Sequence, residues 1–150
     1  MNTLKVGDKA PNFTALDEQG NSISLKDFIG KKLIVFFYPK ANTPTCTVES
    51  CNLSDNYKTL IDYGFNVIGV SADSQKAQAN FKKKYKFPYP LIADVDKEVI
   101  NAFGVWGPKK FMGRTFDGIH RITFVIDETG IIIKVINDVK AKNHASQIME

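Results

Sequence analysis

An unbroken run of apolar and aromatic residues, Leu33–Tyr38, constrains the fold of this chain more than any other feature. A strand that is apolar at every position is buried on both faces, as the central strands of α/β sheets are. Pro39 ends the run, and after a short polar loop a helical pattern extends from Thr45 to about Tyr63. We therefore expect a strand, a tight loop and a helix at the centre of an α/β fold.

The alternation of apolar strands and amphipathic helices continues along the chain. We expect further strands at Asn66–Ser71, Leu91–Ala93, Arg121–Ile126 and Ile131–Ile136, and further helices at Ser74–Tyr85, at Asp96–Phe103 and from about Asn143. Strands that alternate with helices pair in parallel through crossovers, whereas the turn at Asp127–Gly130 joins its two strands as an antiparallel hairpin. The sequence thus predicts one domain over residues 1–150, with a mixed central sheet flanked by helices.

Composition and charge exclude several classes of function. Hydrophobic residues make up 43% of the chain and charged residues 24%, which is typical of globular proteins. The segment Met1–Asp8 lacks the apolar core of a secretory signal, so we expect a cytoplasmic protein without a membrane partner. The net charge of +4 includes the run Lys82–Lys84, but this run lies on an expected helix with few aromatic residues, so nucleic-acid binding is not predicted.

The two cysteines, Cys46 and Cys51, are the residues most suggestive of chemistry. A zinc site would need further ligands, and the only histidines, His120 and His144, are far away in sequence, so no metal or other cofactor is expected. A reducing cytoplasm disfavours a persistent structural disulfide but permits a transient catalytic one. At this stage, two buried structural thiols and a redox-active pair both remain open.

The position of the cysteines within the expected helix indicates what a redox-active pair would require. Cys46 falls at the helix start, where free N–H groups and the helix dipole favour the reactive thiolate over the thiol. Five residues along an intact helix separate the two Cα atoms by roughly 8–9 Å, beyond the limit of about 7 Å for a disulfide. Cys46 and Cys51 can therefore bond only if the first turns of the helix unwind.

The stretch Pro39-x-x-x-Thr43-x-x-Cys46 matches the P-x-x-x-T-x-x-C signature of peroxiredoxins. Together with Cys51 in a C-x4-C spacing, it resembles the active-site stretch of the bacterioferritin comigratory protein, or peroxiredoxin Q, subfamily. The similarity extends along nearly the whole chain and includes Gly118–Asp127 near the end. Many relatives have glycine directly before the first cysteine, where this chain has Thr45.

The resemblance implies a thioredoxin-like fold and a peroxidase that reduces hydrogen peroxide and organic hydroperoxides. It implies that Cys46 is the peroxidatic cysteine, that Cys51 is the resolving cysteine, and that the two form an intramolecular disulfide. Thioredoxin, or in some members glutaredoxin, is the usual reductant of this subfamily, and many members are monomers. A sulfenic acid on Cys46 would be the intermediate that condenses with Cys51.

The resemblance also implies roles for four residues around Cys46. Thr43 would hydrogen-bond the thiolate and the peroxide, and Arg121 would hold a fixed cation beside the sulfur. Pro39 would shield the pocket from water, and Glu49 would orient the arginine or the helix. Taken without the resemblance, these are a loop threonine, a surface arginine, a loop proline and an acid that favours the dipole of a first helical turn.

Two other functions would use the same disulfide. One is a non-enzymatic redox sensor that signals to a partner, although no effector domain is evident. The other is a dithiol oxidoreductase acting on protein disulfides, an activity that normally uses a C-x-x-C pair. His120, next to Arg121, is expected to point to the opposite face if its strand is regular.

Overall fold

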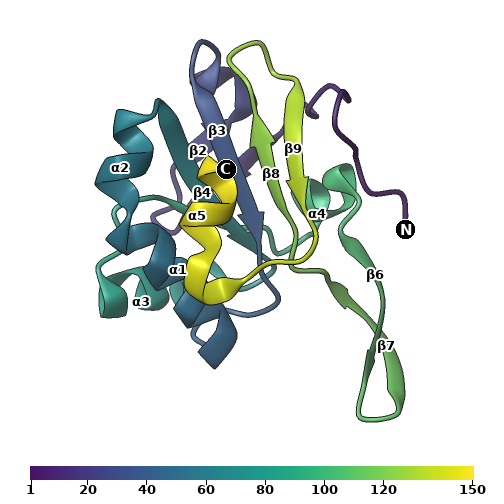
Figure 1. The fold of residues 1–150 in the computed structure, drawn as a ribbon. Helices are drawn as coiled ribbons and strands as arrows, with labels where there is room; N and C mark the ends of the chain where they lie inside the picture. Colours follow the sequence, from purple (N-terminus) through teal and green to yellow (C-terminus); the bar gives the residue numbers. More distant parts are fainter.

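A computed structural model describes residues 1–150 and contains a five-stranded central sheet (Figure 1). The sheet order is β5–β4–β3–β8–β9. Strand β3 pairs in parallel with β4, and β4 pairs in parallel with β5, whereas β8 is antiparallel to both β3 and β9. The predicted mixed sheet is confirmed, with strands at Lys32–Phe37 (β3), Phe65–Ser71 (β4), Leu91–Ala93 (β5), Thr123–Ile126 (β8) and Ile132–Ile136 (β9).

The expected burial of β3 on both faces is also confirmed. Alternate residues from Leu33 to Phe37 belong to one hydrophobic cluster, and the residues between them, from Ile34 to Tyr38, belong to a second cluster across the sheet. Each of these side chains is at most 1% exposed. The run therefore sits at the centre of the molecule and fixes where the following loop emerges.

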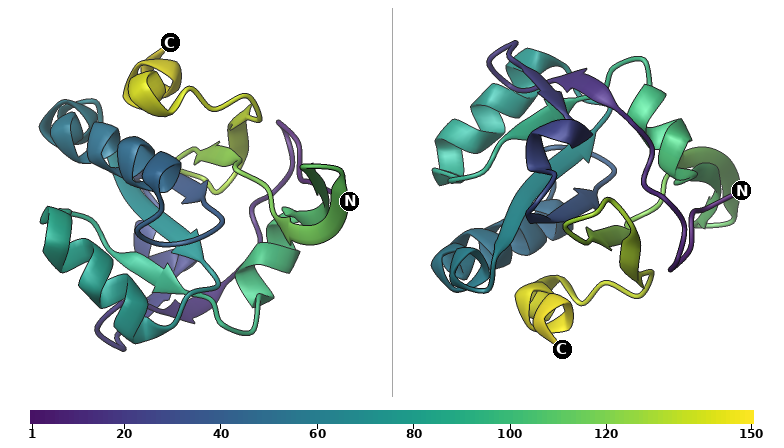
Figure 2. Two further views of the ribbon diagram at one scale, coloured as in Figure 1. Left: turned by 90° about the horizontal axis from the view of Figure 1, so that it is seen from below. Right: turned by 90° about the horizontal axis from the view of Figure 1, so that it is seen from above.

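Helices cover both faces of the sheet, at Pro44–Asp55 (α1), Tyr57–Asp62 (α2), Gln75–Tyr85 (α3), Glu98–Phe103 (α4) and His144–Met149 (α5), with short 3-10 turns at Leu25–Phe28 (η1) and Ala141–Asn143 (η2). Apolar residues of α1, α2, α3 and α5 pack on one face, and those of α4 and η1 pack on the other. Both views in Figure 2 show α5 beside α1. None of the helices is long and apolar enough to cross a membrane.

The structure corrects the expected single helix from Thr45 to Tyr63. It ends one helix at Asp55 and begins another at Tyr57, with Asn56 between them at φ −103° and ψ 11°. The Asn56 side-chain amide donates to the backbone oxygen of Asn52 at 2.8 Å. The Asn56 backbone N–H donates to the same oxygen at 3.2 Å, so Asn56 caps the end of the first helix with both its backbone and its side chain.

Two short hairpins were not predicted from the sequence. One pairs Thr14–Leu16 (β1) with Ser22–Ser24 (β2), and the other pairs Trp106–Phe111 (β6) with Arg114–Ile119 (β7). Figure 1 shows the β6–β7 hairpin projecting from the body of the protein. Strand β8 also begins later than expected, so that Arg121 lies just before it rather than within it.

Candidate active site

Cys46 lies in the first turn of α1, and its side chain is buried with 1% exposure. The helix starts where the loop after β3 reaches Thr43, which has extended backbone angles, and Pro44 takes the first helical position. Proline is well suited there because the backbone N–H it lacks would have no partner within the helix. The sulfur is therefore close to the unpaired N–H groups and positive dipole end of a 12-residue helix.

Arg121 connects Cys46 to Glu49 through one guanidinium group. Its Nη2 atom donates to the Cys46 Sγ atom at 3.1 Å, and its Nη1 atom donates to Glu49 Oε1 at 2.7 Å. The arginine reaches α1 from the segment before β8, because β8 pairs with β3 and Phe37 N donates to Ile122 O at 3.0 Å. The guanidinium cation of Arg121 therefore contacts the sulfur of Cys46, the residue that the sequence analysis predicts to be the nucleophile.

Glu49 is three residues after Cys46, so the two side chains share one face of α1. Its side chain is fully buried, with 0% exposure. Burial raises the pKa of Glu49 to about 7, even though Arg121 pulls it in the opposite direction. The second carboxyl oxygen, Oε2, has no hydrogen-bond partner and faces His144 Nε2 at 3.4 Å.

The loop before α1 places the other two predicted site residues. The Thr43 hydroxyl donates to the backbone oxygen of Lys40 at 2.8 Å rather than to the sulfur, and Pro39 is half-buried. Asp73, after β4, holds the loop by accepting from the Ala41 N–H at 2.7 Å. Thr45 lies within α1 and does not have a positive φ, so glycine is not required before Cys46 in this conformation.

Cys51 is on the same helix but in a different environment. Both thiols are free, and Cys51 is half-buried. Burial raises the pKa of the Cys51 thiol, and the nearby carboxylate of Asp55 raises it further. Cys46 contacts a cation near the helix start, whereas Cys51 is near an acid, so the two sulfurs lie in environments of opposite charge.

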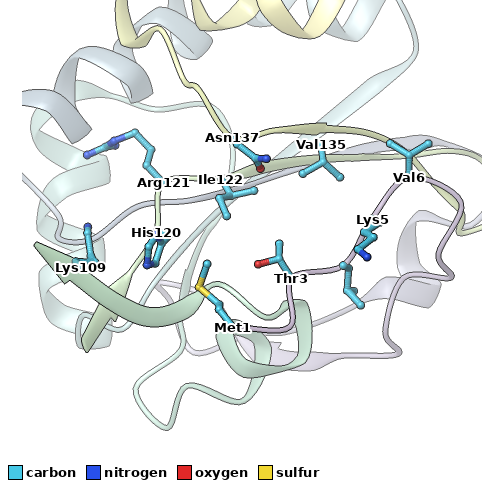
Figure 3. Close-up of a pocket in the computed structure, with 11 residues that line it drawn as sticks. Met1, Thr3, Lys5, Val6, Lys109, His120, Arg121, Ile122, Val135 and Asn137 are labelled. Carbon is cyan, nitrogen blue, oxygen red and sulfur yellow. The ribbon is translucent and has the colours of Figure 1, made fainter. Parts of the chain in front are cut away.

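A cavity of about 630 Å³ lies beside Arg121, between the N-terminal segment and the base of the β6–β7 hairpin (Figure 3). In this view the Arg121 side chain points away from Met1 and Thr3, and the His120 side chain points in another direction. The His120 ring contacts the backbone oxygen of Pro108 at 3.1 Å. Lys109 donates to the backbone oxygen of Ile119 at 2.8 Å, and burial together with Arg121 lowers its pKa.

Sequence reasoning missed Lys109 and His144 as neighbours of the site. Neither residue belongs to a spacing motif, and each reaches the site only through the packing of a distant element. The structure holds no group of three or more His, Cys, Asp or Glu side chains that could bind a metal ion.

Comparisons with known proteins agree with this geometry. Residues 6–135 match the model of the AhpC/TSA family. The peroxiredoxin Bcp of Escherichia coli is 46% identical over 149 residues, which are 99% of this chain and 96% of that protein.

Solved structures of peroxiredoxins share the fold. A cysteine-to-serine variant of PrxQ from Xylella fastidiosa superimposes with a TM-score of 0.92 at 29% identity, covering 99% of this chain and 95% of that one. The bacterioferritin comigratory protein of Xanthomonas campestris, studied for its alkyl peroxide reduction activity, gives a TM-score of 0.85 at 31% identity, covering 91% and 87%. The thioredoxin-like fold is thereby confirmed, and the chain belongs to the AhpC/TSA family, among the peroxiredoxins of the Bcp and PrxQ type.

Proposed function

We propose that this peroxiredoxin reduces hydrogen peroxide and organic hydroperoxides with Cys46 as the attacking thiolate. The observation that carries the proposal is the 3.1 Å contact between Arg121 Nη2 and the Cys46 Sγ atom, in the first turn of α1. The similarity to a Xanthomonas campestris protein studied for alkyl peroxide reduction supports the choice of substrate class.

In the proposed first step, the Cys46 thiolate attacks one peroxide oxygen and the O–O bond breaks. The bonding electron pair goes to the distal oxygen, which leaves as hydroxide or alkoxide and takes up a proton, while the sulfur becomes a sulfenic acid. Arg121 and the free N–H groups at the start of α1 stabilise the negative charge as it moves from sulfur to the leaving oxygen. Glu49 orients Arg121, and its raised pKa limits how far it neutralises the arginine.

Two loop residues complete the proposed site. The Thr43 hydroxyl, which donates to Lys40 O in this conformation, would turn toward the sulfur when a peroxide offers a better acceptor. Pro39, half-buried at the end of β3, would keep water from the pocket. Both roles rest on the peroxiredoxin signature and on the position of the residues directly before Cys46.

In the second step, Cys51 attacks the sulfenic sulfur, water leaves, and a disulfide joins Cys46 to Cys51. Both residues lie within the continuous helix α1, so the first turns must unwind before the sulfurs can meet. An external dithiol, which we propose to be thioredoxin or glutaredoxin, then reduces the exposed disulfide. This cycle suits a single-domain monomer in the reducing cytoplasm, since one chain supplies both cysteines and Arg121.

A single-turnover experiment followed by steady-state turnover with a thioredoxin system tests this function. We expect Cys46→Ser to abolish peroxide consumption. Cys51→Ser should keep a fast first oxidation but lose recycling by thioredoxin. Slow oxidation of the wild-type protein without turnover would favour the redox-sensor alternative, and efficient reduction of insulin disulfides would favour the dithiol oxidoreductase.

A further inference from the structure

His144, the first residue of α5, is fully buried against the carboxyl group of Glu49. Its Nδ1 atom lies 2.9 Å from Gln147 Oε1, and its Nε2 atom lies 2.7 Å from the Thr123 hydroxyl oxygen. The same Nε2 atom is 3.4 Å from Glu49 Oε2. The ring therefore touches the one carboxyl oxygen of Glu49 that Arg121 leaves unpartnered.

The neighbours of His144 determine which ring nitrogen carries a proton. Gln147 Oε1 accepts from the Lys140 N–H at 2.9 Å, and Gln147 Nε2 donates to Asp138 O at 2.8 Å, so the orientation of the amide is fixed. An amide oxygen only accepts hydrogen bonds, so the ring nitrogen that faces it, Nδ1, must be protonated. The protonation state of Nε2 then determines whether Glu49 Oε2 faces a hydrogen-bond donor or a lone pair.

A neutral His144 with its proton on Nδ1 has a lone pair on Nε2, which can accept from the Thr123 hydroxyl at 2.7 Å but offers no donor to Glu49 Oε2 at 3.4 Å. If the carboxyl group were ionised as well, a buried anionic oxygen would face that lone pair without any donor, which is costly in a low-dielectric interior. A single proton between Oε2 and Nε2 removes this conflict, whichever of the two atoms holds it. At 3.4 Å, the two atoms are close enough for the proton to lie on either one.

We propose that His144 is a positioning residue for Cys46, because it shares one proton with Glu49 and so keeps the Glu49–His144 pair without net charge. Arg121 then presents an uncompensated cation to the sulfur. The proposal rests on Cys46 acting as the peroxidatic cysteine. Without the shared proton, the pair would carry a negative charge next to Arg121 and would oppose formation of the thiolate.

The charged and titratable groups around the pair agree with this assignment. Arg121 contacts Glu49 from one side and Cys46 lies beyond it, while Tyr89 approaches α1 through a 2.6 Å bond from its hydroxyl to Ser50 O. Burial raises the pKa of Glu49 to about 7 and lowers the pKa of His144. Because burial opposes the charged form of both groups, the pair holds one proton just below pH 7 and releases it as the pH rises further.

Replacing His144 tests the proposal, with Asn52→Ala as the matched control. The Asn52 side chain forms two hydrogen bonds between α1 and the C-terminal segment, neither of them to Glu49. We expect His144→Ala to slow the single-turnover oxidation of Cys46 by about tenfold at pH 6, the factor that corresponds to one unit on the pH axis. The pH at which Cys46 is half-alkylated by iodoacetamide should rise by about one unit. Asn52→Ala should leave both quantities unchanged.

A second variant covers the case in which His144→Ala does not fold. His144→Gln keeps a polar group of similar size and can donate to Glu49, but it cannot take up the shared proton, so it should also shift the alkylation profile upward. A wild-type profile in a folded His144 variant would overturn the proposal, as would an equal shift in Asn52→Ala. If Cys46→Ser loses peroxide consumption while the His144 variants behave like wild type, the peroxidase function stands. That result refutes only the role of His144.

Discussion

Replacing Arg121 with alanine should slow the first oxidation of Cys46 strongly. The substitution removes a hydrogen bond from a cation to the sulfur, the contact at 3.1 Å between Nη2 and Sγ. Hydrogen bonds to charged groups contribute about 1.5–3 kcal/mol, which corresponds to a loss of roughly 10- to 200-fold in rate if this energy stabilises the transition state relative to the reduced protein. Glu49 also loses its ion-pair partner, but its raised pKa allows it to accept a proton, which limits the cost of leaving it buried.

The assay is stopped-flow oxidation of the reduced protein by hydrogen peroxide at pH 7. Arg114→Ala is the matched control, because it removes the same charge from the only other arginine, which is exposed on β7. We expect Arg114→Ala to react within about twofold of the wild-type rate, since exposed charges at a distance are screened. An unchanged rate in a folded Arg121→Ala protein, or equal losses in both variants, would refute the role of the arginine.

Two further predictions concern the helix and its buried acid. Asn52→Ala removes two 2.8 Å hydrogen bonds that tie α1 to Lys142 O and to the Ala145 N–H. At about 1 kcal/mol each, their loss should ease unwinding and speed disulfide formation after an oxidation pulse by up to about 30-fold, and a slower step would contradict this. Glu49 has a folded-state pKa raised above its unfolded value, so the native state binds the extra proton between about pH 4.5 and 7. Urea unfolding measures this effect by comparing wild type with Glu49→Gln. As the pH rises through that range, the free energy of unfolding of the wild type should fall by up to about 3 kcal/mol relative to the variant. Parallel pH dependence of the two proteins would contradict the raised pKa of the buried carboxyl group.

The central strand and the cysteine at the start of α1 could be predicted because both depend on local sequence. An apolar run such as Leu33–Tyr38 identifies a strand buried on both faces, and the spacing of Cys46 and Glu49 identifies a shared helical face. The break at Asn56 could not be predicted, because apolar residues continue in register through Leu53 and Leu60 on either side of it. The break coincides with a local side-chain hydrogen bond from Asn56 to Asn52 O, which the apolar pattern does not report.

The partners of Glu49 are a second feature that local sequence patterns do not predict. Arg121 was identified only through the peroxiredoxin resemblance, since the pairing of β3 with β8 brings together residues 72 positions apart. His144 has no motif, and it reaches Glu49 because the C-terminal helix packs beside α1. The β6–β7 hairpin was missed because Pro108 and two lysines interrupt the apolar pattern expected of a strand.

Thiol counting and peptide mass spectrometry after addition of one equivalent of peroxide test the central claim most directly. The account predicts that wild-type protein loses both thiols and yields a single peptide pair joined through Cys46 and Cys51. Cys51→Ser should instead stop at a sulfenic acid on Cys46. Peroxide consumption that leaves Cys46 unmodified, or a sulfenic acid that forms first on Cys51, would contradict the account.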